Sequence, residues 1–452
     1  MSTHSQPRRP AARAGFLHAW DQLVGGSPLP TVPRRRGRKP RVPLHDLLAA
    51  LTYHLLQGTG ILAEHFTQLF GTTLADSSWS DRRQRLPWEI FAELMRRVLR
   101  PRATAAQADA FWRGWRLLAL DGTQFSLTNT AQVRATRPKA RSRRGRAAFA
   151  KMTTAVLLEL GLHNPVAAAI GRHGESEWAL ALQTLAHLPA QALLLADRLY
   201  GCAAFAAQAQ VACQRVGSHF LFRARMLIKP QVIRRLRDGS RLVRVPVREP
   251  GRPHHIVEWL EVREIRMRVG RPGHRAQVLR LWTSLRDPRT APALDLAQLY
   301  ARRWEHELYF REVKRQLRKT ALLQSHTVDT GAQEIAAVVL ASAVRAVERT
   351  TTADDQLSVL RVSFPKLLQV VQAMWLTLSL GEGVLSERQI QTMLKRGYAR
   401  LRQCRTPARR SRSCPRKVRQ PIKRWPRLMR IGGRTVSPGD PMRRRHGISE
   451  RH

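Results

Sequence analysis

The sequence predicts an α/β protein, with an all-helical unit ahead of the sheet and an antiparallel β segment inserted into it. Three observations favour this fold class. Residues 41–115 repeat apolar side chains at helical spacing, residues 116–217 mix short apolar runs with helical segments, and residues 218–290 alternate apolar with polar or basic side chains. The chain has 452 residues, which is enough for two or three domains with a substantial core.

The composition indicates a polyanionic partner. Lys and Arg number 79 against 32 Asp and Glu, a formal net charge of +47 that opposes compaction until it is neutralised. Nucleic acid is the expected partner, since each neutralised phosphate adds salt-dependent affinity. No run of eighteen apolar residues and no apolar signal core is present, so we expect a cytoplasmic, nucleoid-associated protein with no membrane partner.

The cysteines predict neither a disulfide framework nor a standard zinc site. There are four, and none belongs to a CxxC pair. Cys404, Cys414 and His446 offer zinc ligands, but a fourth ligand and the usual spacing are missing.

The two ends of the chain are the most basic segments. Residues 1–40 are rich in Pro and Arg and end in PRRRGRKP, which predicts a disordered basic arm. Residues 386–452 form an Arg-rich tail, with 20 Lys or Arg against two acids after residue 394. We expect the part of the tail from Lys395 onward to be disordered until it meets nucleic acid. Residues 41–115 are predicted to form a helical DNA-binding domain.

The predicted core begins in residues 116–217 with two apolar runs that each end in an aspartate. Arg116–Leu120 precedes Asp121, and Ala192–Ala196 precedes Asp197. A further strand is predicted at 153–160, and helices are predicted at 178–188 and 203–215. An aspartate after a strand is more often a turn residue than a catalytic one, so neither carries a site alone.

An antiparallel β insertion is predicted at 218–290, where glycines punctuate alternating segments with a basic outer face. The second part of the core follows at 291–385. It holds the helix around residue 307 and two apolar helices near 332–347 and 364–380.

One helix in this second part carries an unusual polar stripe. At 100° per residue, four side chains fall within about 60° of one another on a helix: Tyr300, Arg303, Glu307 and Lys314. Apolar residues flank the stripe, and the face made of Arg302, Glu305, Glu312 and Gln316 is predicted to meet solvent. Charges within an apolar arc need partners and often mark a site. The alternative is an ordinary solvated helix with ion pairs one turn apart.

Asp121, Asp197 and Glu307 together predict a metal site. Three carboxylates brought together repel one another unless a hard cation neutralises them, and Mg²⁺ (or Mn²⁺) prefers oxygen ligands. Two such ions would stabilise the attacking and leaving oxygens of an in-line phosphoryl displacement.

The chain resembles DDE transposases of the insertion-sequence-4 type. The resemblance is carried by LLALDGT around Asp121, LLLADRLYG around Asp197 and the spacing of the four stripe residues. Supporting matches are GESE at 174–177, FLFRAR at 220–225 and LWTSL at 281–285.

The resemblance implies a ribonuclease-H-like mixed sheet flanked by helices, interrupted by the β insertion. It also implies a homodimer on DNA, bound to terminal inverted repeats and target. Tyr300, Arg303 and Lys314 would then contact the reactive strand near its terminal phosphates. Arg223 and Trp282 are further candidate DNA contacts, and Trp304 is a second candidate for an aromatic that stabilises a flipped base.

The predicted function is metal-dependent cleavage and rejoining of element ends, of the cut-and-paste type, with Asp121, Asp197 and Glu307 as catalytic and metal-binding residues. Two alternatives remain: a metal-dependent nuclease on the same fold, and a catalytically inactive nucleic-acid-binding protein descended from a transposase.

Overall fold

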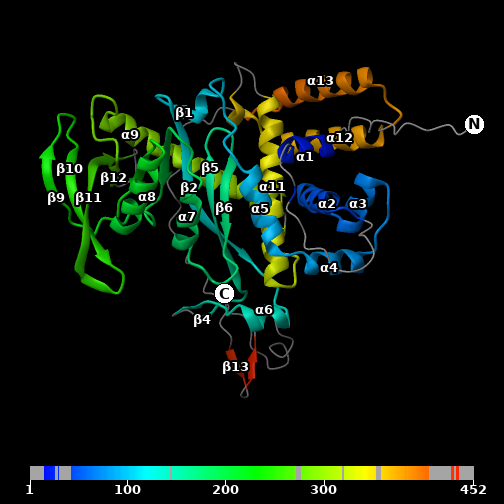
Figure 1. The fold of residues 1–452 in the computed structure, drawn as a ribbon, viewed down its shortest axis with the longest axis horizontal. Coiled ribbons are helices and arrows are strands. Elements are labelled where there is room, and N and C mark those ends of the chain that lie inside the picture. Colours follow the sequence, from blue (N-terminus) through cyan, green and yellow to red (C-terminus); the bar gives the residue numbers. More distant parts are fainter. Residues whose placement is uncertain are drawn as a thin grey trace, which may run out of the picture.

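A ten-stranded mixed sheet forms the centre of the computed structural model, with helices on both faces (Figure 1). The structure describes residues 15–25, 29, 42–142, 145–270, 276–317, 320–352, 358–381, 383–406, 429–431 and 434–436. Along its main path the strand order is β6-β5-β2-β7-β8-β12-β11-β10-β9, and β1 pairs with β2 off that path. The predicted α/β class with a mixed sheet is confirmed.

A bundle of short helices precedes the sheet and packs at the end of the molecule opposite the β9–β11 strands (Figure 1). It comprises α1 (Phe16–Val24), α2 (Leu44–Gln57), α3 (Leu62–Phe70), α4 (Asp76–Arg85) and α5 (Trp88–Val98). Each of α1, α2 and α5 contacts the long helix α11 (Val328–Thr352), so the bundle and the sheet share one apolar interior.

Helix α1 corrects the prediction of a disordered arm over residues 1–40. Phe16 and Trp20 are fully buried, and the Phe16 ring lies 4.9 Å from the Tyr53 ring and 5.3 Å from the Trp375 ring. Burial of each such aromatic side chain contributes roughly 1.5–3 kcal/mol, which offsets part of the cost of ordering the short helix. The Arg-rich remainder of the arm, residues 1–14 and 30–40, lies outside the described residues.

The core of the sheet consists of β2 (Trp115–Ser126), β5 (Lys151–Glu159), β6 (Asn164–Ile170), β7 (Ala192–Ala196) and β8 (His219–Arg223). β7 runs parallel to both β2 and β8, whereas β5 is antiparallel to β2 and to β6. β2 is longer than predicted and continues past Asp121 because β5 supplies it with hydrogen-bond partners as far as Ser126.

Alternate residues of the central strands face two separate apolar layers. Leu118 and Leu194 pack with α7 (Glu177–Leu185) and α8 (Ala203–Arg215), whereas Leu117 and Leu193 pack on the side of α11. This is the period of two expected of a strand buried on both faces. Odd-numbered positions of β2, Asp121 among them, therefore face the side that carries α10 and α11.

The β insertion extends the same sheet. It comprises β9 (Gln231–Arg235), β10 (Arg241–Glu249), β11 (Arg252–Val269) and β12 (Gln277–Thr283), all paired antiparallel, with β12 hydrogen-bonded to β8. The predicted antiparallel segment is thus present, except that its first strand, β8, pairs parallel with β7 and belongs to the core.

The helices that follow the insertion pack on the face of the sheet that also carries α11. These are α9 (Ala293–Tyr300), α10 (Trp304–Glu312), a π-helical turn (Val313–Leu317), α11, α12 (Phe364–Leu380) and α13 (Glu387–Gln403). From Val328 to Thr350, α11 is long and apolar enough to cross a membrane, but 94% of its most apolar stretch is buried inside the fold. Its apolarity is therefore accounted for by packing.

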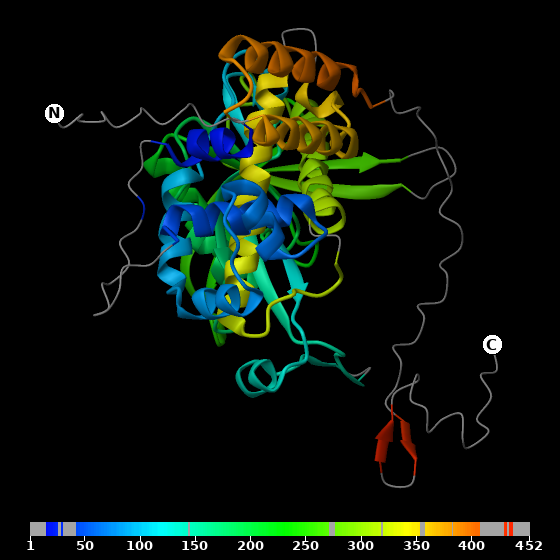
Figure 2. The same cartoon turned by 90° about the vertical axis from the view of Figure 1, so that its right-hand side faces the viewer.

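Helix α13 (Glu387–Gln403) corrects the prediction that the tail is disordered from Lys395 onward. It begins with a capping box between Ser386 and Gln389 and lies along α12 and α11 (Figure 2). Beyond residue 406 only the backbone of a short hairpin is described, β13 (Met429–Ile431) and β14 (Arg434–Val436). The remainder of the predicted tail, with Cys414 and His446, lies outside the described residues.

The remaining short elements connect these units. They are β1 (Phe111–Trp112), α6 (Ala131–Thr136), β3 (Arg141–Ser142), β4 (Gly145–Arg146) and 3-10 turns at Ala108–Ala110, Ala301–Arg303 and Val359–Arg361.

Candidate active site at the end of strands β2 and β7

Strand register brings Asp121 and Asp197 together. In the parallel pairing of β2 with β7, Leu120 lies opposite Ala196, so the next residue of each strand is an aspartate. Parallel pairing stops there because β7 ends at Ala196 and the chain turns away. The two carboxylates therefore occupy the carboxyl end of the parallel pair, where α/β sheets gather functional side chains.

Each aspartate uses one oxygen to hold its own backbone. Asp121 Oδ1 accepts a hydrogen bond from the Gly122 N–H at 2.9 Å, and Asp197 Oδ1 accepts from the Leu199 N–H at 2.7 Å. The turn role anticipated for such residues is real, and the second oxygen of each remains for other partners. Burial, followed by the nearby charge of Asp197, raises the pKa of Asp121 to about 7.

Glu307 reaches this site from α10 through Arg303. Arg303 Nη2 lies 2.6 Å from Glu307 Oε1, and Arg303 Nη1 lies 3.6 Å from Asp121 Oδ2. Burial alone would lower the pKa of Arg303, but its hydrogen bond to Glu307 and the charge of Asp121 outweigh this and raise it. One guanidinium thus links the acid on the sheet with the acid on the helix.

The other predicted contact residues surround this group. Tyr300 is buried beside Arg303, Arg223 and Asp197, and burial raises its pKa to about 12. The Lys314 ammonium lies 5.4 Å from the centre of the Phe125 ring on β2. The site therefore brings together six of the predicted residues: Asp121, Asp197, Glu307, Tyr300, Arg303 and Arg223. Lys314 packs against Phe125, which lies further along β2 than Asp121.

Glu177 is a fourth carboxylate at the site that sequence reasoning missed. It begins α7 on the opposite face of β2 and accepts a hydrogen bond from the Tyr200 hydroxyl at 2.9 Å. Gly122 leaves room for it, because a Cβ at that position would lie 2.2 Å from Glu177 Cδ. Glu177 is the last residue of the GESE motif at 174–177. The signal available was an acid in that motif together with the glycine that follows Asp121.

A second glycine joins the turn after Asp197 to β8. A Cβ on Gly201 would lie 1.9 Å from the Arg223 carbonyl oxygen, so only glycine allows this approach. The turn DRLYG, which begins at Asp197, therefore packs directly against Arg223, the last residue of β8.

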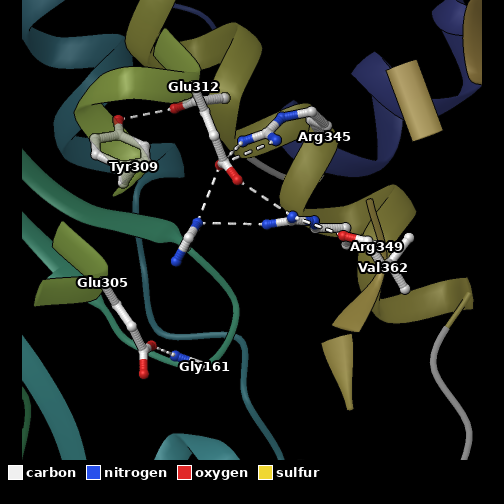
Figure 3. A network of polar contacts seen from close by, with 9 residues as sticks. Gly161, Glu305, Tyr309, Glu312, Arg345, Arg349 and Val362 are labelled. Carbon is white, nitrogen blue, oxygen red and sulfur yellow. Dashed lines mark hydrogen bonds and ion pairs between the residues drawn. The ribbon is translucent and has the colours of Figure 1, made fainter. Parts of the chain in front are cut away.

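The prediction that Glu305 and Glu312 face solvent is wrong. Glu312 is buried and pairs with Arg345 and Arg349 of α11, and Glu305 Oε2 accepts a hydrogen bond from the Gly161 N–H at 3.0 Å (Figure 3). Helical periodicity identified the face but not its partners. Cations 33 and 37 residues downstream of Glu312 make it an interior face.

The prediction that Trp282 contacts DNA is also wrong for this structure. Its side chain is fully buried, and its Nε1 donates to Glu264 Oε2 at 3.3 Å. Trp304 is 50% exposed, so its assignment to DNA stays a prediction.

The donor set at the site fits a hard divalent cation in its chemistry, because carboxylate oxygens are the ligands such ions prefer. The pKa of Asp121 is raised first by burial and then by the charge of Asp197, and Arg303 opposes this rise only in part. In the part of the chain that the structure describes, however, no three His, Cys, Asp or Glu side chains lie close enough to hold a metal ion together. Glu307 is directed to Arg303 instead.

The mixed sheet's parallel strand pair, the two aspartates at its end and the glutamate on a following helix all lie within one segment of the chain that matches a known family. Residues 112–343 match the family described as "Transposase DDE domain". The chain belongs to this transposase family.

The chain is also similar to a curated transposase. It is 28% identical over 273 residues to the transposase InsG for insertion sequence element IS4 of Escherichia coli strain K12. The match covers 59% of this chain and 60% of the relative. The resemblance to transposases of the insertion-sequence-4 type is confirmed.

Proposed function

We propose that this chain cleaves DNA at the ends of a mobile element and joins the freed ends to target DNA. The observation that carries the proposal is the register of β2 with β7, which sets Asp121 beside Asp197, together with Arg303, which links Asp121 to Glu307. A protein that only bound DNA would gain nothing from carboxylates gathered against phosphates.

The reaction consists of two displacements at phosphorus. Water attacks a phosphodiester at the element end, forming one P–O bond and breaking another, and this releases a 3′-OH. That hydroxyl then attacks a phosphodiester of the target and displaces a second 3′-OH. No covalent bond between protein and DNA is required, and no Ser or Tyr nucleophile is proposed.

Asp121, Asp197 and Glu307 would hold Mg²⁺ or Mn²⁺, which supplies positive charge to the phosphate under attack. To join the aspartates as a ligand, Glu307 would leave Arg303, since these two side chains are paired in the structure. The freed Arg303 guanidinium would then face a phosphate oxygen of the reactive strand, for which its planar fork is well suited.

Basic surfaces would hold the DNA. Helices α2–α5 are proposed to bind the terminal inverted repeats, and two copies of the chain are proposed to pair two ends as a homodimer. Arg223 and Tyr300 would guide the strand into the site, since they stand beside Arg303 and Asp197.

The test is single-turnover cleavage of duplexes that carry the ends of the element encoding the chain. Asp121→Asn, Asp197→Asn and Glu307→Gln should each abolish cleavage with Mg²⁺ or Mn²⁺ and leave end binding largely intact, because arginine contacts to phosphate remain. Ca²⁺ should support binding but little cleavage. Glu387→Gln, on the outer helix α13, is the matched control and should cleave normally.

Cleavage that survives in any of the three variants would remove that residue from the assignment. Cleavage without joined products at any target concentration would favour a nuclease on the same fold. Binding without cleavage by the unaltered chain, with every divalent cation, would favour the inactive DNA-binding protein.

A further inference from the structure

Helix α10 is fixed to the rest of the protein by three polar side chains on one face. Glu305, Tyr309 and Glu312 are spaced by four and three residues, so at 100° per residue they fall within about 60° of one another. Glu307 lies roughly opposite this face on the same helix. We call Glu305, Tyr309 and Glu312 the mounting face of α10.

Glu312 is the centre of the mounting face. Its Oε2 lies 3.3 Å from Arg345 Nη1 and its Oε1 lies 3.3 Å from Arg349 Nη2 (Figure 3). Oε2 also lies 3.0 Å from His163 Nδ1. Burial alone would raise the pKa of Glu312, but the charges of Arg349, His163 and Arg345 hold it well below the usual range. The carboxylate is therefore ionised and bound from three sides.

The two arginines are themselves held in place. Arg345 stacks 3.7 Å over the centre of the Phe364 ring, and Arg349 Nη2 also donates to the Val362 carbonyl at 3.4 Å. Both belong to α11, the helix that runs between the sheet and the N-terminal bundle. Glu312 thus connects α10 to α11, most of whose described residues are buried.

The remaining mounting contacts point to two elements. Tyr309 and Ser342 of α11 share a hydrogen bond of 3.0 Å, and Glu305 accepts from the Gly161 N–H in the turn between β5 and β6. His163 lies in the same turn, in a left-handed backbone conformation (φ 52°) that is uncommon for a residue other than glycine.

That turn belongs to the sheet that carries Asp121. It follows β5, in which Val156 pairs with Asp121 of β2. Contacts from Gly161 and His163 to α10 therefore tie the helix to the strands of the site, and contacts from α11 fix its rotation. A rotation of α10 would swing Glu307 and Arg303 away from Asp121.

We infer that Glu312, bound by Arg345, Arg349 and His163, is a positioning residue that sets the rotation of α10 and so aims Glu307 and Arg303 at Asp121. The inference rests on the proposed function for its effect on cleavage, but not for its effect on the helix. Glu312 touches no reacting atom, and its influence is transmitted through the backbone of α10.

Glu312→Gln removes the charge and keeps the shape. With saturating end duplex, we expect its single-turnover cleavage to fall at least about tenfold while the Kd for the duplex stays within about twofold, since misplaced groups cost rate more than affinity. In the DNA-free protein, amide hydrogen exchange over residues 304–317 should rise, while exchange in β2 and β7 should not.

Glu264→Gln is the matched control. Glu264 is also a buried carboxylate bound by arginines, Arg241, Arg266 and Arg280, but it lies in the insertion on β11. The control should lose thermal stability as Glu312→Gln does, yet leave exchange over residues 304–317 and the cleavage rate unchanged. Tyr309→Phe, which removes only the hydroxyl contact with Ser342, is a milder second variant for the case that Glu312→Gln does not fold.

Tyr309→Phe should show the same pattern as Glu312→Gln at smaller amplitude. The inference is overturned if a folded Glu312→Gln cleaves at the unaltered rate, or if Glu264→Gln loosens α10 and slows cleavage equally. If Glu312→Gln does not fold, unchanged exchange and rate in Tyr309→Phe overturn it. Failure of the unaltered chain to cleave any end duplex would refute the proposed function instead, and the exchange data would still decide whether the mounting face holds α10.

Discussion

Arg303 Nη2 lies 2.6 Å from Glu307 Oε1, one helical turn further along the chain. The same guanidinium lies 3.6 Å from Asp121 through Nη1. Two acids that would serve as metal ligands are thus linked by a cation that would serve as a phosphate ligand. A metal ion would replace Arg303 as the partner of the two acids, and a DNA phosphate would replace the acids as the partner of Arg303.

Arg303→Ala should therefore slow cleavage more than it weakens binding. We expect a loss of about 100-fold in single-turnover rate with a small change in Kd, because positioning controls the rate while many other cations share the binding. Arg303→Lys should be nearly as slow, since an ammonium cannot make a bidentate contact. Rate and affinity that fall in parallel would return Arg303 to a structural ion-pair role.

Lys314→Ala tests the other cation of the stripe. Lys314 lies over the Phe125 ring, further along β2 than Asp121. If it contacts the reactive strand, strand transfer should fall more than total DNA affinity when both are measured on the same end duplex. A fall in melting temperature with unchanged strand transfer would contradict that role.

Gly122→Ala should destabilise the protein through Glu177. The new methyl group would lie 2.2 Å from the present position of Glu177 Cδ, and overpacking of this kind costs about 1–3 kcal/mol. Thermal unfolding measures the loss. The double variant Gly122→Ala, Glu177→Ala should recover part of it, and equal melting temperatures for the single and double variants would disprove the clash.

The buried Glu348 carboxyl should make the free energy of unfolding depend on pH. Burial raises the pKa of this carboxyl from 4.5 to about 7, with hydrogen bonds from Tyr398 and Trp375 opposing the shift. The folded state prefers the neutral acid, so its contribution to stability is complete below pH 4.5 and is lost as pH rises through 7.

Glu348→Gln should remove this dependence, because the amide keeps an acceptor and cannot ionise. We expect the variant to gain up to about 3 kcal/mol relative to the unaltered protein between pH 4.5 and pH 8. Urea unfolding at a series of pH values measures the difference. A difference that stays constant over this range would contradict the shifted pKa.

Truncation after Thr406 tests the basic tail. The cut falls there because the backbones of Cys404 and Thr406 bond to Ser363 and Arg361 beside α12. Removal of the 15 Lys and Arg that follow should flatten the salt dependence of DNA binding and preserve preference for element ends. Loss of discrimination between cognate and random duplexes would make the tail a specificity determinant.

Sequence reasoning reached the residues that meet at the site because their signals are local. Two apolar runs end in aspartates, and the four stripe residues keep a helical spacing that no long-range contact is needed to see. The α/β class and the antiparallel insertion followed from the same kinds of pattern. Strand register, which makes Asp121 and Asp197 neighbours, could not be obtained this way.

The sequence predictions that proved wrong share one physical cause. Glu305 and Glu312 look like solvent residues until their distant partners are known, and Phe16 and Trp20 lie within an Arg- and Pro-rich segment that masks their helix. Trp282 was predicted to contact a DNA base, but it is buried and its Nε1 donates a hydrogen bond to Glu264. In each case a partner far along the chain decides whether a side chain is buried.

The connection of α10 to α11 also sets an order in time. A ribosome releases this chain from its N-terminus, so β2 and β7 can pair well before Arg345 and Arg349 have been made. Nascent chains would therefore hold all three acids before the helix that aims Glu307 is secured. A chain that stops short of Arg345 would carry Asp121, Asp197 and Glu307 but lack both arginines that bind Glu312.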